Sequence, residues 1–432
     1  MSIHRWITLV LGSAAAAQVG STIDEGIYRW ARDGAGPMRP SFSFEDASRR
    51  DEGTPGATNA RVTPSIERAG DTTTVRITIE PGTSLYGTGE AGGRLLRNGM
   101  TIETWNTDAY GYDATSQSLY QSHPWVLAVR EDGTSFGVLA DTTTKVRIAL
   151  DGEIEMSSDG PDFPVIVIEA DTPQGVVTGL SSLTGTIDLP PMWALGYHQC
   201  RYSYVPEARV REIASEFRSR SIPCDVIWMD IDYMDGFRCF TFDPATFPDP
   251  TALNDDLHEQ GFHTVWMIDP GIKKEDGYAV YDSGTAIDAW VKTADGSTYV
   301  GDVWPGACVF PDFTNDAVRT WWAGLYADFL ATGIDGVWND MNEPAIFNVA
   351  SKTMPLDNLH RADEAFGGPG SHAIFHNVYG MQMIRATREG ITSLRPERRP
   401  FVLSRANFIG GHRYGATWSG DNTANWWHLE AS

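Results

Sequence analysis

The feature that most limits what this chain can fold into is a change of pattern at Pro190-Pro191. Beyond it, short apolar runs alternate with segments whose apolar residues recur every three or four positions, which is typical of parallel strands joined by helices. The strand-like runs are 193–198, 224–230, 263–269, 335–340, 400–404 and 415–419, and the helical patterns are 206–220, 249–261, 316–333 and 371–391. Because the strand-like runs are apolar nearly throughout, we expect strands that are buried on both faces.

Strands of this kind occur in (β/α)8 barrels and in doubly wound open sheets, and both folds place functional residues at the carboxyl ends of strands. The residues before Pro190 are typical instead of an antiparallel β-sandwich, with strand-like segments at 72–80, 125–132, 135–141 and 163–170 separated by turns. We therefore predict an α/β chain with an N-terminal β-sandwich domain over 1–187 and a second domain over 188–432, for which the pattern favours a (β/α)8 TIM barrel and leaves a doubly wound sheet as the alternative. The polar stretch 49–71 predicts an exposed loop or hairpin, and the run Trp6 to Leu11 predicts a first strand.

The net charge excludes several classes of partner. The 432 residues carry a formal charge of -24, and a field of this sign repels phosphates, so we expect neither nucleic acid nor an anionic membrane surface as a partner. A neutral substrate is compatible with it. The 15 Trp, 15 Tyr and 18 Phe supply flat apolar faces that stack on the C–H surfaces of sugars, although any single ring is more often part of the core. The sequence indicates no oligomeric state.

Apolar run lengths and the first twenty residues indicate the compartment of the protein, and the cysteine pattern indicates the redox state of its thiols. No apolar run approaches the length of about 18 residues that spans a bilayer. The first twenty residues have one early Arg5, a short apolar run and small residues that could form a signal peptide. We prefer the first-strand interpretation and a cytoplasmic location, with a secreted or periplasmic protein as the alternative. The four cysteines form no C-x-x-C pair and have no histidines at zinc-finger spacing, which predicts reduced thiols.

Carboxylates gather where the strand-like runs end. The run 224–230 ends in Asp230, with Asp232 and Asp235 just beyond it; the run 335–340 ends in Asp340, with Glu343 beyond it; and Asp421 follows the last run. If these ends meet at one mouth, several acidic groups surround one pocket, and such crowding indicates function.

Clustered carboxylates serve either metal binding or glycoside cleavage. The segment "DIDYMDG" is similar to a calcium loop, but its third Asp falls one position late and Thr241 stands where the loop needs a Glu. We therefore expect no metal and no organic cofactor. The match of "GTGEAG" (87–92) to the dinucleotide fingerprint lacks a following helix, so it predicts a Gly-rich turn. No G-x-S-x-G nucleophile elbow is present either.

Glycoside cleavage needs one ionised carboxylate and one that carries a proton. Asn339 and Asn342 lie close in sequence to Asp340 and could hold it as the anion, which makes Asp340 the better nucleophile. Asp421, beside Trp418 near the chain end, is then the candidate proton donor. The alternative is that Asp421 is a capping or turn residue.

Motifs along nearly the whole chain resemble glycoside hydrolase family 31, the retaining α-glucosidases and α-xylosidases. They are "LYGTGE", "WNTDAYGYD", "LYQSHPW", "LGYHQCRYSY", "VIWMDIDYMDG", "VWPGACVFPDF", "WNDMNEP" and "RYGATWSGDN", in this order. The resemblance implies that Asp340 is the nucleophile, that Asp421 is the general acid/base and that Glu343 supports the nucleophile. It further implies that the substrate-binding residues are Asp108, Tyr202, Asp230, Ile231, Ile272, Trp304, Trp338, Met341, Arg405 and Trp418.

The resemblance predicts a retaining, exo-acting α-glucosidase that acts on a neutral oligosaccharide or α-glucoside. α-Xylosidase or transglucosylase activity, or a carbohydrate-binding fragment without catalysis, are the alternatives. The sequence departs from the family at Ser432, eleven residues after Asp421. We therefore expect an incomplete barrel that lacks strands 7 and 8 and the C-terminal β-domains, and low solubility or weak activity for this segment alone.

Overall fold

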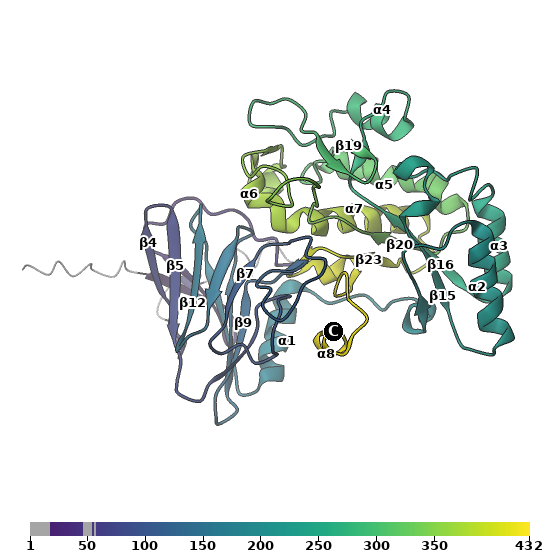
Figure 1. Ribbon diagram of the computed structural model, residues 1–432. Coiled ribbons are helices and arrows are strands. Elements are labelled where there is room, and N and C mark those ends of the chain that lie inside the picture. The colour runs from purple at the N-terminus through teal and green to yellow at the C-terminus, as the bar shows by residue number, and fades with distance from the viewer. Residues whose placement is uncertain (1–17, 46–53, 56–57) are drawn as a thin grey trace, which may run out of the picture.

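The computed structural model describes residues 18–45, 54–55 and 58–432. An antiparallel β-sandwich from the first part of the chain lies beside a curled parallel sheet covered by helices (Figure 1). The predicted fold class, a β-sandwich followed by an incomplete barrel, is confirmed. The predicted strand from Trp6 to Leu11 lies outside the described residues.

Two sheets form the sandwich, and together they confirm the four strand-like segments predicted there. The seven-stranded sheet has the order β3-β1-β2-β13-β10-β9-β6 and the five-stranded sheet the order β4-β5-β12-β11-β7, counted over the described residues. Their bounds are β1 Gln18–Asp24, β2 Ile27–Arg32, β3 Thr54–Pro55, β4 Ser65–Ala69, β5 Thr72–Thr78, β6 Ser84–Gly87, β7 Thr101–Thr104, β9 Trp125–Val129, β10 Ser135–Ala140, β11 Val146–Ala149, β12 Glu153–Asp159 and β13 Val165–Ala170. The polar stretch 49–71 contains β4, which forms a hairpin with β5.

Burial in the sandwich follows from which faces are covered. In β5, Thr73, Val75 and Ile77 point into the core between the sheets and their neighbours are partly exposed, as one-sided burial requires. All of β10 is buried, because helix α1 (Pro173–Thr184) packs on its other face. Thr172 begins this helix by accepting from the N–H of Gly175.

The curled sheet is parallel, with the strand order β14-β15-β16-β20-β23-β25 among the described residues. Its strands are β14 His198–Gln199, β15 Val226–Met229, β16 His263–Ile268, β20 Gly336–Asn339, β23 Val402–Ser404 and β25 Ala416–Thr417. The helices that follow the strands are α2 Glu207–Ser219, α3 Pro250–Glu259, α5 Asp316–Ala331 and α7 Tyr379–Leu394. All four residues of β15 and of β20 are buried, as expected for strands covered on both faces.

The first strand of this sheet does not lie where the sequence predicts it. Residues 192–195 form the 3-10 helix η2 (Met192–Leu195), and only His198 and Gln199 pair with β15. The turn closes because Ala194 donates to the carbonyl of Pro191 and Gly196 to that of Trp193. A side chain at Gly196 would meet the carboxylate of Asp225 at 2.0 Å, so this turn presses directly on the next strand's start.

An excursion between β16 and α5 was not predicted. It contains β17 Ile272–Lys273, α4 Ala279–Ala286, β18 Gly301–Val303 and β19 Gly306–Val309, and β17, β19 and β18 pair antiparallel. The remaining elements are short: β8 Gln121–Ser122, η3 Ile231–Tyr233, η4 Asp235–Phe237, β21 Leu359–His360, η5 Glu364–Phe366, β22 Gly370–Ser371, α6 His372–Phe375, η6 His376–Val378, β24 Asn407–Phe408, η7 Gly411–Arg413 and α8 Trp426–Ala431.

None of the described helices is long and apolar enough to cross a membrane, and all four cysteines are free.

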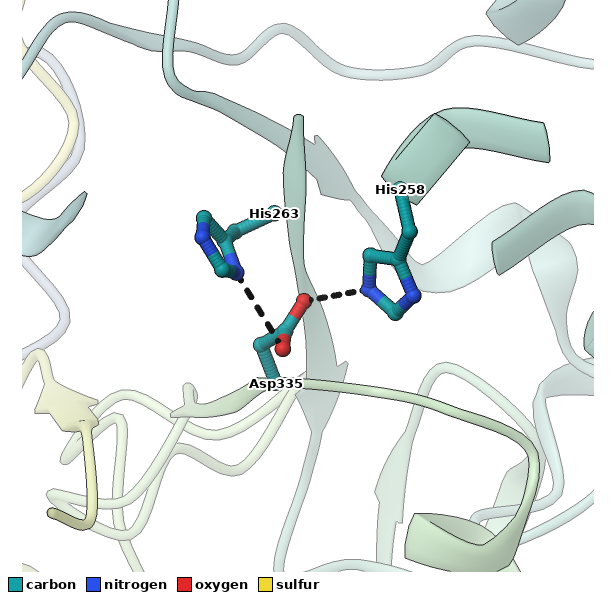
Figure 2. A group of neighbouring side chains, drawn as sticks. All are labelled: His258, His263 and Asp335. Atoms are coloured by element: carbon teal, nitrogen blue, oxygen red, sulfur yellow. Dashed lines mark hydrogen bonds and ion pairs between the residues drawn. The ribbon is translucent and has the colours of Figure 1, made fainter. Parts of the chain in front are cut away.

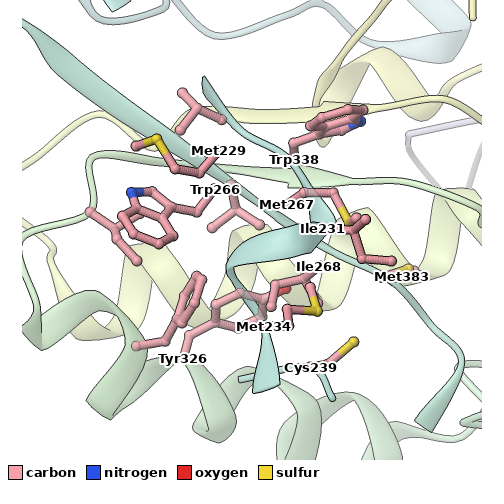
Figure 3. Packing of buried hydrophobic residues seen from close by; sticks show 14 of the residues in the cluster. Met229, Ile231, Met234, Cys239, Trp266, Met267, Ile268, Tyr326, Trp338 and Met383 are labelled. Atoms are coloured by element: carbon pink, nitrogen blue, oxygen red, sulfur yellow. The ribbon is translucent and has the colours of Figure 1, made fainter. Parts of the chain in front are cut away.

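The two ends of the parallel sheet differ: structural contacts hold the amino ends of the strands, and polar residues leave their carboxyl ends. At the amino ends of β16 and β20, Asp335 accepts from the N–H of Thr264 and contacts the rings of His258 and His263 (Figure 2). Between the sheet and α5, Trp266 and Ile268 pack near Tyr326 in a continuous apolar core (Figure 3). This packing fixes the strands, and therefore the residues that leave their carboxyl ends.

Backbone pairing joins the two halves of the molecule. Strand β8, from the sandwich part, pairs in parallel with β24, which follows the fifth strand of the curled sheet. This ladder brings the loops of the sandwich to the mouth of the parallel sheet.

Candidate active site

A pocket opens at the carboxyl ends of the parallel strands. Eleven of the residues predicted for the site line it: Asp108, Tyr202, Asp230, Ile231, Trp304, Trp338, Asp340, Met341, Arg405, Trp418 and Asp421. Two predicted residues do not. Glu343 lies behind Arg405 and is 1% exposed, and Ile272 is fully buried in β17, where it pairs with Val309.

Asp340 leaves the sheet at the end of β20. Its N–H donates to the carbonyl of Ile268 at 3.3 Å, which continues the pairing with β16 for one more residue. Met341 then adopts a left-handed backbone with φ 54°. Such a conformation is strained for a side chain of this size and is typical of functional sites; here it turns the chain sharply so that the Asp340 side chain faces the pocket.

Arg405 is the cation around which the carboxylates gather. Its guanidinium makes two bonds of 2.8 Å to Glu343 and lies 3.3 Å from Asp340, 3.2 Å from Asp421 and 3.7 Å from Asp108. The side chain is 2% exposed. One buried guanidinium thus serves four carboxylates, and the pocket keeps an excess of negative charge.

Burial changes the titration of the carboxyl groups in the pocket. Burial raises the pKa of Asp340 to about 7, against the opposing charge of Arg405 and with the help of Glu343 and Asp421. Burial also raises the pKa of Asp230 to about 6, although the N–H of Ile231 opposes it. The pocket therefore holds protons that isolated carboxyl groups would release at neutral pH.

The expected support of Asp340 by neighbouring amides is not met. Asn339 donates to the carbonyl of Ile268 and to the hydroxyl of Tyr326, and Asn342 donates to Ser404 and accepts from the N–H of Ala406. Both amides are fully buried, and these hydrogen bonds go to groups other than the carboxylate of Asp340. The group that favours the anionic form of Asp340 is Arg405, which lies 65 positions later in the chain.

Asp421 occupies a different environment from Asp340. Its side chain is 49% exposed, and its Oδ2 accepts from the hydroxyl of Tyr120 at 3.1 Å. Gly420 precedes it with φ 73°, and a side chain there would meet the ring of Tyr120 at 2.1 Å. The segment carrying Asp421 is therefore pressed against a residue of the sandwich part, and the carboxylate keeps access to water.

The turn at 87–92 supports this arrangement from behind. It is a Gly-rich turn, as predicted, with Gly87 and Gly89 at φ 94° and 77°. Glu90 in this turn accepts from the N–H of Tyr120 at 3.1 Å, and burial raises the pKa of Glu90 to about 7. The ring of Tyr120 also lies under the guanidinium of Arg405, 4.9 Å from its centroid.

A loop of the sandwich part closes one side of the pocket. Asp108 is in this loop, and its backbone carbonyl accepts from the ammonium group of Lys352 at 2.6 Å. The same ammonium group lies over the ring of Tyr110 at 5.1 Å. Lys352 and Tyr110 both line the pocket and were missed, because residues in loops carry no periodic signal.

Aromatic rings form the walls and the rim. Trp338 and Trp418 meet edge to face at 5.4 Å, and Trp304 stacks on Tyr202 at 6.1 Å near the opening. Trp304 is 38% and Tyr202 57% exposed. Exposed ring faces beside carboxylates that share a single cation are suited to binding a neutral polar molecule with C–H faces and hydroxyl groups.

One buried acid beneath the pocket could have been predicted. Asp269 follows β16 just as Asp230 follows β15 and Asp340 follows β20. It is buried, and burial together with the charge of Asp340 raises its pKa well above its usual range. The strand-end pattern that singled out the other two carboxylates applies equally to it.

Among the described residues, one group of three side chains could hold a metal ion, and it lies far from this pocket. It is the cluster of His258, His263 and Asp335 at the amino ends of the strands (Figure 2). Asp335 already accepts from Thr264 and from the ring of His258, and Arg398 lies 3.9 Å away. Because Asp335 already has these partners, we assign its carboxylate a structural role.

Two family models match the chain. The model described as "Glycosyl hydrolases family 31 TIM-barrel domain" matches residues 187–432, and "Glycosyl hydrolase 31 N-terminal galactose mutarotase-like domain" matches residues 35–148. "Alpha-glucosidase 2" of Bacillus thermoamyloliquefaciens is 44% identical over 80% of this chain and 44% of its own length. Human "Neutral alpha-glucosidase AB" is 44% identical over 58% of this chain and 26% of its own length.

Solved structures agree with these matches. The family 31 alpha-glucosidase from Bacteroides thetaiotaomicron is 56% identical, with a TM-score of 0.74 over 82% of this chain and 58% of that one. The glucosidase II alpha subunit in its Glc1Man2-bound form is 31% identical, with a TM-score of 0.79 over 94% of this chain and 48% of that one. The chain thus spans less than half the length of the curated relatives named above.

Proposed function

The chain belongs to glycosyl hydrolase family 31, and we propose that it hydrolyses terminal α-glucosidic bonds with retention of configuration, through a glycosyl-enzyme intermediate. In the first step, a carboxylate of Asp340 attacks the anomeric carbon while Asp421 gives its proton to the leaving oxygen. In the second step, Asp421 takes a proton from water, and the resulting attack releases the sugar from Asp340.

The observation that carries this proposal is the shared contact of the two carboxylates with one guanidinium. Asp340 and Asp421 line the same pocket and lie 3.3 Å and 3.2 Å from different nitrogens of Arg405. Their environments differ. The side chain of Asp340 is 14% exposed and lies beside Arg405, whose charge favours the attacking anion, whereas the side chain of Asp421 is 49% exposed and can exchange protons with water.

The excess of negative charge supports bond cleavage of this type. The sugar ring gains positive charge as the glycosidic bond breaks. With Asp421 protonated for the first step, three carboxylates around Arg405 still leave a negative field at the ring, and a fixed field needs no reorganisation during the reaction. Glu343 contributes to this field through Arg405, which it holds in place.

The substrate class is supported by the printed names of the relatives, which are alpha-glucosidases. We propose that Asp230 and Asp108 accept hydrogen bonds from sugar hydroxyl groups, while Trp338 and Trp418 cover the ring faces. Trp304 and Tyr202 then contact the leaving group at the rim. α-Xylosides and transfer to an acceptor sugar remain alternatives in the same pocket.

Substitution of the proposed nucleophile tests the proposal. Asp340→Asn keeps the shape of the side chain but removes the attacking anion, so we expect turnover of an aryl α-glucoside to fall by about a thousandfold or more, while glucose still binds. Asp235→Asn is the control, because Asp235 is exposed and lies outside the pocket. Turnover in the Asp340→Asn variant close to that of the unaltered chain would contradict the assignment.

Two further measurements separate the alternatives. NMR of the first sugar released should show the α anomer, because two displacements at one carbon restore the configuration. Comparison of aryl α-glucosides with aryl α-xylosides then tests the sugar. Binding of glucose without any turnover would favour a carbohydrate-binding fragment.

A further inference from the structure

Three buried histidines form a continuous hydrogen-bonded chain outside the pocket. Nδ1 of His360 lies 2.9 Å from Asp312, and its Nε2 lies 3.0 Å from Nδ1 of His372. Nε2 of His372 lies 3.0 Å from Nδ1 of His376, whose Nε2 lies 2.7 Å from the backbone carbonyl of Asn106. The four side chains of this chain are completely buried.

Counting protons shows that three neutral rings cannot satisfy these contacts. Each of the four contacts needs one proton, and the partners at the two ends, a carboxylate and a carbonyl, can only accept. Three neutral imidazoles carry three N–H groups in total. The chain is complete only when it holds a fourth proton.

The fourth proton belongs at the Asp312 end. The carboxylate of Asp312 also accepts from the hydroxyl and the N–H of Thr314 and from the N–H of Arg361. His360 is the one of the three rings that contacts this carboxylate, so the fourth proton is placed on it. Burial lowers the pKa of His376 to about 3 and that of His372 well below its usual range, so neither of these two rings is the carrier.

With His360 doubly protonated, the direction of every bond is fixed. His360 donates to Asp312 and to His372, His372 donates from Nε2 to His376, and His376 donates from Nε2 to the carbonyl of Asn106. A neutral chain would instead set two lone pairs against each other between His372 and His376. The hydroxyl of Thr353, 3.4 Å and 3.3 Å from these two nitrogens, would then be their only donor among the contacts of the chain.

The chain ends on the loop that carries Asp108. Asn106 donates two hydrogen bonds of 3.0 Å to Asn377, and Trp105 stacks on the ring of His376 at 3.7 Å. Lys352, next to Thr353 in sequence, donates to the carbonyl of Asp108. The loop is thus held by the same short segment of the barrel part that contains the histidines.

We propose that Asp312, His360, His372 and His376 form a hydrogen-bonded chain that carries one fixed extra proton on His360, and that this chain positions the Asp108 loop at the pocket. The four residues are positioning residues, since they act on the substrate through Asp108. This second part rests on the proposed function of the pocket, whereas the proton count rests on the hydrogen bonds alone.

The charge state can be measured directly. The measurement is NMR of the 432-residue chain labelled with ¹⁵N-histidine, with the imidazole signals recorded at about pH 9, where ordinary histidines are neutral. We expect one ring with both nitrogens protonated, and an Nε2–H tautomer for His372. Ten neutral rings, with His372 protonated at Nδ1, would overturn the proposal.

Two variants assign the signal and test the alternative. Asp312→Asn removes the partner of the charge, so the doubly protonated ring should disappear. Thr353→Val removes only the hydroxyl, so it should leave that signal unchanged if His360 is charged. Loss of the signal or a changed tautomer of His372 in Thr353→Val would support the neutral chain and contradict our count.

Positioning of the loop has its own readouts. In Asp312→Asn we expect amide hydrogen exchange over residues 104–110 to become about tenfold faster, and the affinity for glucose to fall about fivefold. Asp335→Asn is the matched control: Asp335 also contacts histidine rings and accepts from a backbone N–H, but at the opposite end of the sheet (Figure 2). It should alter neither quantity.

The outcomes separate the two claims. Equal loop exchange in Asp312→Asn and in the unaltered chain would refute the positioning role. If the unaltered chain bound no glucose, the proposed function would fail, while the histidine signals and the loop exchange would still decide the proposal on the hydrogen-bonded chain. Should Asp312→Asn fail to fold, the spectra of the unaltered chain and of Thr353→Val decide the proton count, and His360→Gln tests the loop.

Discussion

Replacing Arg405 by lysine tests the central claim about the pocket, that a planar guanidinium is needed to hold its carboxylates. Lysine keeps the charge but has a single nitrogen, whereas Arg405 makes two bonds of 2.8 Å to Glu343 and one of 3.2 Å to Asp421. A hydrogen bond to a charged group contributes about 1.5–3 kcal/mol, and breaking a buried pair costs about 3–5 kcal/mol. Since lysine retains part of the attraction, we expect Arg405→Lys to lower the free energy of unfolding by about 2–4 kcal/mol.

Urea unfolding, followed by tryptophan fluorescence and by circular dichroism, measures this loss. Arg398→Lys is the control, because Arg398 is 60% exposed and lies 3.9 Å from its carboxylate, so its replacement should change stability by less than about 0.5 kcal/mol. Combining Arg405→Lys with Glu343→Gln should give a smaller loss than the sum of the two single changes, because both remove the same bonds. Additive losses, or a loss in Arg405→Lys no larger than in the control, would refute the reasoning.

Three further predictions concern single groups. Since the pKa of Glu90 is raised from 4.5 to about 7, the folded chain keeps a proton that the unfolded chain releases, so stability falls as pH rises from 4.5 to 7. Glu90→Gln mimics the protonated form, so it should be up to about 3 kcal/mol more stable than the unaltered chain at pH 8 and equal to it at pH 4. Urea titrations at both pH values measure this difference. Burial raises the pKa of Asp340 to about 7, and the proposed nucleophile must attack as the anion, so kcat/KM should fall tenfold per pH unit below 7; a flat profile between pH 5 and 7 would contradict this role. Gly420→Ala should cost about 2–4 kcal/mol and reduce turnover, because its new methyl group meets Tyr120, whereas Gly133→Ala, at a similar positive φ in open space, should cost about 1 kcal/mol and leave turnover unchanged.

Elements that depend on local pattern could be predicted from the sequence. The strands β15, β16 and β20 lie within the apolar runs 224–230, 263–269 and 335–340, because strands buried on both faces leave an unbroken apolar signal. The first strand could not be placed, since the turn at 192–196 depends on its contact with Asp225. The division of the chain into domains at residues 187 and 188 stays a prediction.

The site could be predicted as far as its residues follow strands or match family motifs. Asp230 and Asp340 end apolar runs, and they do line one pocket. The partner of Asp340 could not be found from its neighbours, because the neighbouring amides turn into the core while the cation comes from Arg405. Tyr120 contacts Asp421 and His376 contacts Asn106 across hundreds of residues of sequence, and no local periodicity marks such contacts.

The hydroxyl of Tyr120 and the ladder between β8 and β24 have a consequence for how the molecule is divided. The group that steadies Asp421 belongs to the sandwich part and the guanidinium that Asp421 contacts belongs to the barrel part, so the proposed site exists only where the two parts meet.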